Sequence, residues 1–169
     1  MANKYYKQIM TLEELLQKRI NNNSNTGTKN KASEFKMTND LYVDLFDILT
    51  SLNYKVKKIA KEFKLTNGIC DFVCELENNE YLIIECKTKG NCEYENYDLK
   101  FAYAIGQLLT YKTILCMQYN IDKNKVKLML ATDDDSLLTL DVINHENLNV
   151  DYLVYNKEGV KYYGKNRQT

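Results

Sequence analysis

The chain has 169 residues, of which 44% are hydrophobic, and its 23 lysines and arginines balance its 23 aspartates and glutamates. This length suits one domain with a core and is short for two. No apolar run approaches the roughly 20 residues that span a bilayer, the start lacks the apolar segment of an export signal, and the five cysteines are scattered. These features argue against a membrane protein and a disulfide framework, and we expect a soluble, cytoplasmic protein.

The charges are unevenly distributed along the chain, although their sum is zero. Residues 1–36 hold seven basic side chains against three acids, and residues 53–64 hold five lysines against one glutamate. Residues 70–98 hold eight acids against two lysines. Basic segments that border an acidic one are expected where a polyanion is held around a cation site, although such runs are as often ordinary solvated surface.

The N-terminal segment has the pattern of an appendage. Thr11 and Glu14 form a capping box in front of a short amphipathic helix at residues 12–20. The polar stretch 21–33 lacks apolar anchors and is typical of a linker or loop. We therefore predict a basic, helical N-terminal extension and linker at 1–32, followed by a single core domain at 33–169.

The core domain is predicted to begin with a helix at 40–52, capped by Thr38 or Asn39. A strand at 54–60 and a basic loop follow. Asp44 lies at the margin of the apolar stripe of the helix. The stripe consists of Leu41, Leu45, Ile48, Leu49 and Leu52.

Two β-rich runs, 69–76 and 80–87, are predicted to form a hairpin whose turn uses asparagines, which tolerate positive φ. Because side chains alternate along a strand, one face should carry the acids and a lysine, and the opposite face should carry the cysteines as small core residues. The first face comprises Asp71, Val73, Glu75, Tyr81, Ile83, Glu85 and Lys87, and the second comprises Cys70, Phe72, Cys74, Leu82, Ile84 and Cys86.

The remaining elements are predicted as a helix at 99–117, a buried strand at 125–132, a helix at 133–143 and a closing hairpin at 150–163. Gln107 and Tyr111, one turn apart, share an edge of the first of these helices. The order of elements predicts an α/β fold, with a mixed central sheet that helices cover on its faces.

Asp71, Glu85 and Lys87 can converge if the two strands of the hairpin pair. Carboxylate oxygens are the ligands that Mg²⁺ prefers, and a bound Mg²⁺ can neutralise phosphate charge and activate water. A lysine on the same face can contact the same phosphate. An isolated Glu-x-Lys is commonplace on a solvated strand, but Glu85 lies in an apolar run, where an idle carboxylate is costly. Asp44, on the edge of an apolar stripe, is a second awkward acid.

The stretch GICDFVCELENNEYLIIECK resembles the core motif of the PD-(D/E)XK phosphodiesterase superfamily, in which a metal-binding Asp lies on one strand and Glu-x-Lys on the next. The helix segment AYAIGQLLTYK resembles the Q-x-x-x-Y helix of several branches, including Holliday-junction-resolvase-like enzymes and excision-controlling factors of the XisH type. The resemblance extends over most of the chain from about residue 33. It implies the restriction-endonuclease-like fold and a metal-dependent DNA endonuclease.

The resemblance also implies roles for individual residues. Asp71 and Glu85 match the metal ligands, and Lys87 matches the catalytic lysine. Asp44 matches the acid of the first core helix as a third metal ligand, with Glu34 as the runner-up for that place. The implied cofactor is Mg²⁺, for which Mn²⁺ can substitute.

Gln107 and Tyr111 match accessory catalytic positions that contact phosphate or orient the lysine. The sequence departs from the family pattern where Cys70 stands in place of proline before the Asp. DNA is the implied partner, and because one such site cuts one strand, we expect a homodimer or higher homo-oligomer.

Other interpretations remain open. Three cysteines of the hairpin could bind zinc, but no CxxC pair exists. His145 lies in a polar segment without a nearby nucleophile. A catalytically silent or partner-dependent DNA-binding or recombination factor of the same fold is the alternative function, and a protein interaction module with a merely solvated hairpin is a third.

Overall fold

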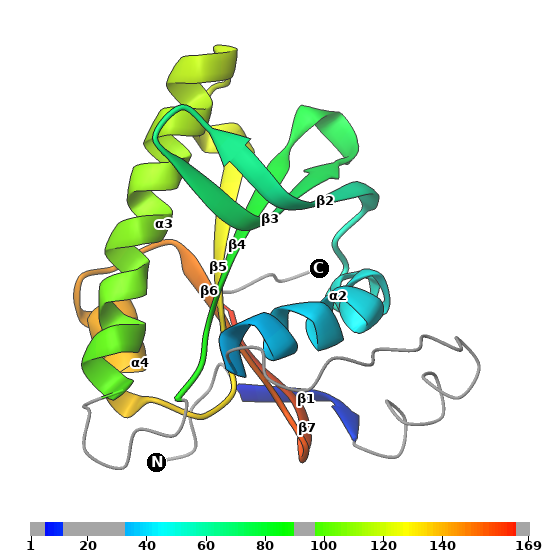
Figure 1. The fold of residues 1–169 in the computed structure, drawn as a ribbon, viewed down its shortest axis with the longest axis vertical. Helices are drawn as coiled ribbons and strands as arrows, with labels where there is room; N and C mark the ends of the chain where they lie inside the picture. Colours follow the sequence, from blue (N-terminus) through cyan, green and yellow to red (C-terminus); the bar gives the residue numbers. More distant parts are fainter. Residues whose placement is uncertain (1–5, 12–32, 90–96, 165–169) are drawn as a thin grey trace.

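Seven strands form one mixed sheet with helices on both faces in the computed structural model of the chain, which describes residues 6–11, 33–89 and 97–164 (Figure 1). The helices are α2 (Ser33–Ser51), α3 (Tyr97–Tyr119) and α4 (Leu137–His145). The strands are β1 (Tyr6–Thr11), β2 (Val56–Leu65), β3 (Gly68–Leu76), β4 (Tyr81–Lys87), β5 (Val126–Thr132), β6 (Val150–Asn156) and β7 (Gly159–Tyr163). The predicted α/β architecture is confirmed.

The sheet order is β1-β7-β6-β5-β4-β3-β2. Strands β4, β5 and β6 run parallel, whereas the pairs β2/β3, β3/β4, β6/β7 and β1/β7 are antiparallel. Parallel neighbours need a crossover connection, and here α3 joins β4 to β5 while α4 joins β5 to β6. Strand β4, which carries Glu85 and Lys87, is therefore an interior strand of the sheet.

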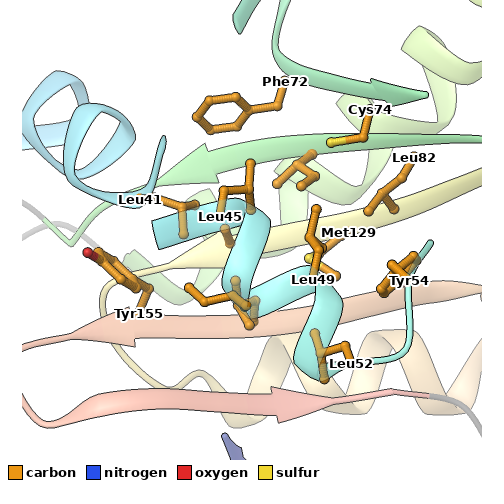
Figure 2. Packing of buried hydrophobic residues seen from close by; sticks show 14 of the residues in the cluster. Leu41, Leu45, Leu49, Leu52, Tyr54, Phe72, Cys74, Leu82, Met129 and Tyr155 are labelled. Atoms are coloured by element: carbon orange, nitrogen blue, oxygen red, sulfur yellow. The ribbon is translucent and has the colours of Figure 1, made fainter. Parts of the chain in front are cut away.

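Each face of the sheet packs on a separate apolar cluster. Helix α2 covers one face, and α3 and α4 cover the other (Figure 1). The α2 stripe predicted from the sequence is buried, and Leu41, Leu45 and Leu49 are fully enclosed (Figure 2). Each such leucine contributes roughly 1.5–3 kcal/mol relative to an exposed one. This packing holds α2 against the strands that carry the candidate site.

Several predicted boundaries were wrong. Helix α2 begins at Ser33 rather than near Thr38, so Glu34 lies in its first turn. Strand β2 continues to Leu65, through the stretch predicted as a basic loop. Helix α4 begins only after Ser136, whose Oγ accepts the backbone N–H of Thr139 as an N-cap. The three aspartates before it thus precede the helix.

The N-terminal residues correct the predicted division of the chain. Residues 6–11 form β1, an edge strand that pairs with β7. These residues belong to the sheet rather than to an appendage, because their backbone bonds continue its ladder. The helix predicted at 12–20 lies outside the described residues. Among the helices that the structure describes, none is both long enough and apolar enough to cross a membrane.

The predicted turn between β3 and β4 is confirmed. A short 3-10 turn spans Glu77–Asn79, and Asn78 and Asn79 have φ of 61° and 56°. Asparagine tolerates this left-handed conformation better than most residues. The turn sets the register in which Phe72 pairs with Ile84.

Candidate active site

Asp71 lies where the pairing between β3 and β4 ends. The last cross-strand pair is Phe72 with Ile84, and beyond it the backbone N–H of Cys86 donates to Asp71 Oδ2 at 2.7 Å. The carboxylate therefore takes the place of a ladder acceptor. This bond fixes Asp71 beside the end of β4, where Glu85 and Lys87 stand.

The neighbouring strand is distorted at the same level. Glu62 lies between the pairs Lys61–Phe72 and Phe63–Cys70 and has φ of 52°, which is unusual for a residue with a long side chain. Strict alternation also fails at this end of β3. Cys70 joins the cluster under α3, not the α2 face that simple alternation predicts.

Glu85 is a buried carboxylate with one partner and one free oxygen. Its residue exposure is 3%, and its Oε1 accepts a hydrogen bond from Lys87 Nζ at 2.6 Å. Its Oε2 is buried and has no hydrogen-bond partner among the described residues. An unpartnered buried carboxylate oxygen costs stability, so its presence calls for an explanation such as a catalytic role or a bound ion or water.

Glu34, in the first turn of α2, is the acid of this helix that lies next to Lys87. Its Oε1 lies 3.5 Å from Lys87 Nζ, and its Oε2 lies 3.4 Å from the Nζ of Lys100 on α3. Ser33 at the start of α2 contacts Thr88 through their hydroxyl oxygens, 2.9 Å apart, which ties the helix to the end of β4. The site is thus assembled from α2, β3, β4 and α3.

Asp44 does not reach Lys87, and its predicted assignment as the helix acid of the site is not supported by the geometry. It is 2% exposed, and its Oδ2 accepts a hydrogen bond from Tyr155 on β6 at 2.6 Å. It follows Glu34 by ten residues, which is about 15 Å along a helix axis. The earlier start of α2 explains the difference, because it brings Glu34 into a first turn that the sequence did not predict.

The pKa values reflect crowding of acids in a buried place. Burial, and after it the negative charge of Asp71, raises the pKa of Glu85 to about 7, although the positive charge of Lys87 acts in the opposite direction. Burial also raises the pKa of Asp71, although the Cys86 N–H opposes it. Burial lowers the pKa of Lys87, but attraction to Glu85, Glu34 and Asp71 outweighs this effect and the net shift is upward. Lys87 is therefore an ammonium ion at neutral pH.

Gln107 and Tyr111 lie on the sheet side of α3, next to this group. Gln107 Nε2 donates to the Tyr111 hydroxyl at 2.7 Å. Burial raises the pKa of Tyr111 and the nearby charge of Glu85 adds to this, whereas the bond from Gln107 opposes it. A Cβ placed on Gly68 would lie 2.8 Å from the Tyr111 ring, so a glycine is needed for this close approach.

Metal ligands can come from the two strand carboxylates. Among the described residues no set of three His, Cys, Asp or Glu side chains is arranged around one point as a metal centre. Mg²⁺ is often held by only one or two carboxylates, with waters and substrate phosphate completing its shell. The free Oε2 of Glu85 beside Asp71 fits that kind of site.

The zinc alternative is not supported. Cys70 lies in the α3 cluster, whereas Cys74 and Cys86 lie in the α2 cluster. Burial raises the pKa of Cys70 and of Cys74 to about 12, so both remain thiols. His145 is exposed, and its Nδ1 lies 3.1 Å from Oε1 of the adjacent Glu146. It is not part of the group formed by Asp71, Glu85 and Lys87.

Lys100 was not identified from the sequence as a neighbour of the site. Its Nζ donates to the backbone oxygen of Thr88 at 3.0 Å and pairs with Glu34. It lies in the first turn of α3, and no sequence spacing links this turn to the hairpin. Only the crossover geometry after β4 brings it there.

Comparisons with known proteins identify the fold. A repair endonuclease from Pyrococcus abyssi matches with a TM-score of 0.50 and 15% identity, over 78% of this chain and 50% of the endonuclease. The structure of an EndoMS–dsDNA2 complex matches with a TM-score of 0.44 and 13% identity, over 78% of this chain and 48% of that one. An XisH family protein from Nostoc punctiforme matches with a TM-score of 0.41 and 16% identity, over 69% of this chain and 92% of the XisH protein.

No family model and no curated protein sequence matches the chain. The chain spans about half the length of the Pyrococcus endonuclease. At 15% identity the likeness to that enzyme shows the fold alone, and it confirms the restriction-endonuclease-like fold that the sequence motif implied.

Proposed function

We propose that this chain is a metal-dependent phosphodiesterase, an endonuclease that hydrolyses DNA. The observation that carries the proposal is the buried Glu85, which lies near both Asp71 and the charged Lys87 and has one carboxylate oxygen without a hydrogen-bond partner in the described part of the chain. A structural ion pair would not need the second acid or the free oxygen. The likeness of the fold to a repair endonuclease supports the same class of reaction.

Asp71 and Glu85 would hold Mg²⁺ or Mn²⁺ in this proposal, with Glu34 close enough to Lys87 to assist as the acid of the helix. The bound metal would polarise the phosphate and lower the pKa of a bound water. Binding requires the ionised form of Glu85, whose pKa of about 7 makes metal affinity fall as pH decreases below neutrality.

Lys87 would act as a fixed positive charge. Its side chain is 14% exposed, so it remains in reach of a phosphate while its Nζ is held by Glu85 and Glu34. Because its pKa is raised, it supplies charge to the transition state and hydrogen bonds that orient the phosphate or water. It is not the group that removes a proton from water at neutral pH.

Strand β2 would contact the backbone phosphates of the DNA. It is an edge strand, and Lys57, Lys58 and Lys64 on it are exposed. Exposed lysines neutralise phosphates without reading bases, so this contact predicts affinity that falls steeply with salt. Lysines on edge strands also prevent aggregation, and the salt dependence of binding separates the two roles.

The experiment is cleavage of supercoiled plasmid, linear duplex, branched junction and single-stranded DNA, with Mg²⁺, Mn²⁺ or EDTA. We expect metal-dependent cleavage that Glu85→Gln and Lys87→Ala abolish. The matched control is Glu75→Gln, which removes an acid from the same hairpin outside the group. Cleavage that persists in Glu85→Gln would refute the assigned site. Absence of cleavage by the wild type, together with metal binding that depends on Asp71, would instead favour the partner-dependent factor.

A further inference from the structure

Helix α3 exposes an apolar stripe on the side that faces away from the sheet. Its members are Leu99, Tyr103, Gly106, Thr110, Thr113 and Met117, which we call the α3 stripe. Leu99, Tyr103 and Met117 are 40%, 72% and 79% exposed, and the other three are exposed as well. In Figure 1 the helix runs along the outside of the molecule, with α4 beside its N-terminal half.

The α3 stripe carries no charge over about five helical turns. The charged residues of the helix, Asp98, Lys100 and Lys112, lie outside it. The hydroxyls of Thr110 and Thr113 donate to the backbone oxygens of Gly106 and Leu109, at 2.9 and 3.0 Å. They therefore present methyl groups rather than free donors. A surface helix normally carries charge on its outward side, so this side has the composition of a contact surface.

Gly106 is not required by the packing of α3 against the described residues. Apart from its chain neighbours and the backbone of its own helix, an added Cβ would meet none of their atoms within 4 Å. Glycine inside a helix costs about 1 kcal/mol relative to alanine. At the middle of an outward stripe, a missing side chain allows another helix to approach closely.

The spacing of the α3 stripe is symmetric. Successive members are separated by four, three, four, three and four residues, so the pattern is the same in either chain direction. This is the heptad spacing of helices that pair along a seam. In an antiparallel pair about a two-fold axis, Leu99 faces Met117, Tyr103 faces Thr113, and Gly106 faces Thr110. Every member meets another member, with a large side chain opposite a small one at Tyr103.

We propose that a second copy of this chain covers the α3 stripe, in an antiparallel, two-fold symmetric pair of α3 helices. An isologous interface requires a self-complementary surface, and an uncharged stripe with palindromic spacing meets this requirement. The inference does not depend on the proposed nuclease function.

The area indicates where the interface extends. The stripe is about 27 Å long, and one helix is about 10 Å wide. A contact of this length and width buries less than the roughly 800 Å² per partner of a standard interface. An antiparallel pair places α4 of one copy beside the C-terminal half of α3 of the other. Leu137 and Leu138 on α4 are 77% and 38% exposed, and Tyr119 at the end of α3 is 50% exposed. In the proposed pair these exposed side chains would extend the apolar contact.

Sedimentation velocity of the metal-free protein, over a wide concentration range, tests the proposal. We expect a dimer for the wild type and at least about tenfold weaker association for Gly106→Glu and for Thr110→Lys, because each buries a charge. Circular dichroism checks the fold, which Gly106→Glu should stabilise because glutamate has the higher helix propensity. The matched control is Thr50→Glu on the exposed side of α2, which should leave the dimer unchanged.

A mixing experiment tests the register. Position 106 of one copy faces position 110 of the other, so an equimolar mixture of Gly106→Glu and Thr110→Lys should form the dimer that neither forms alone. A wild type that stays monomeric at every concentration would overturn the proposal. So would a Gly106→Glu dimer as strong as that of the wild type. A mixture that remains monomeric would overturn the antiparallel register.

Discussion

Replacing Glu85 by glutamine should make the metal-free protein more stable at pH 8 and not at pH 5. The pKa of Glu85 is raised from 4.5 in its ordinary state to about 7 in the fold. Below pH 4.5 the side chain is protonated in both the folded and the unfolded chain. As pH rises from 4.5 to 7, the unfolded chain loses this proton and the folded chain retains it, so the wild type loses stability.

The magnitude follows from the size of the shift. One pKa unit corresponds to 1.36 kcal/mol, so a rise from 4.5 to about 7 costs the wild type about 3 kcal/mol at pH 8. Glutamine has the same shape and no charge to bury. It leaves Lys87 with Glu34 and Asp71 as neighbouring acids. We therefore expect a net gain of about 1–3 kcal/mol in the free energy of unfolding.

The assay is urea unfolding of both proteins in EDTA at a series of pH values from 5 to 8. The difference in unfolding free energy should grow with pH and flatten above about pH 7. Adding Mg²⁺ should then stabilise the wild type and not the variant. A variant that is less stable than the wild type at pH 8, or a difference that does not depend on pH, would refute the assignment of Glu85 as a destabilising buried carboxylate.

Three further predictions concern the same site. Lys87→Met should lower the cleavage rate by about 10²–10³-fold with little change in metal affinity, measured by single-turnover kinetics and calorimetry. Asp44→Asn should destabilise the fold by about 1–3 kcal/mol and leave cleavage largely intact, whereas Glu34→Gln should reduce cleavage at nearly unchanged stability. The opposite ranking of these two variants would show that Asp44 is the helix acid after all. Gly68→Ala should cost about 1–3 kcal/mol by displacing the Tyr111 ring, and Tyr111→Leu should suppress this cost in a double-mutant cycle.

The local sequence pattern was sufficient to predict those features that depend on a single helix or on one hairpin. The hairpin of β3 and β4 follows from alternation and from asparagines that accept positive φ, and both were found. The apolar stripe of α2 follows from helical periodicity and was also found. Asp71, Glu85 and Lys87 meet because a hairpin brings neighbouring strands together whatever the rest of the chain does.

Contacts between distant elements could not be read in this way. Glu34 reaches Lys87 across 53 positions of sequence, and Lys100 reaches Glu34 only because α3 crosses over after β4. Asp44 looked awkward from its sequence position because its partner, Tyr155, lies 111 positions away. Cys70 was placed on the wrong side because strict alternation does not hold at the start of β3, where Cys70 packs in the α3 cluster while Phe72 packs in the α2 cluster.

The sequence by itself therefore determined the α/β class, the hairpin and the Asp, Glu and Lys of the candidate site, because these depend on periodicity and on turns between adjacent residues. The tertiary structure alone decided which acid of α2 lies beside Lys87, that residues 6–11 belong to the sheet, and that the outer side of α3 is exposed. These outcomes depend on how helices are placed against the sheet. That placement minimises exposed apolar area over the whole chain rather than within any one segment.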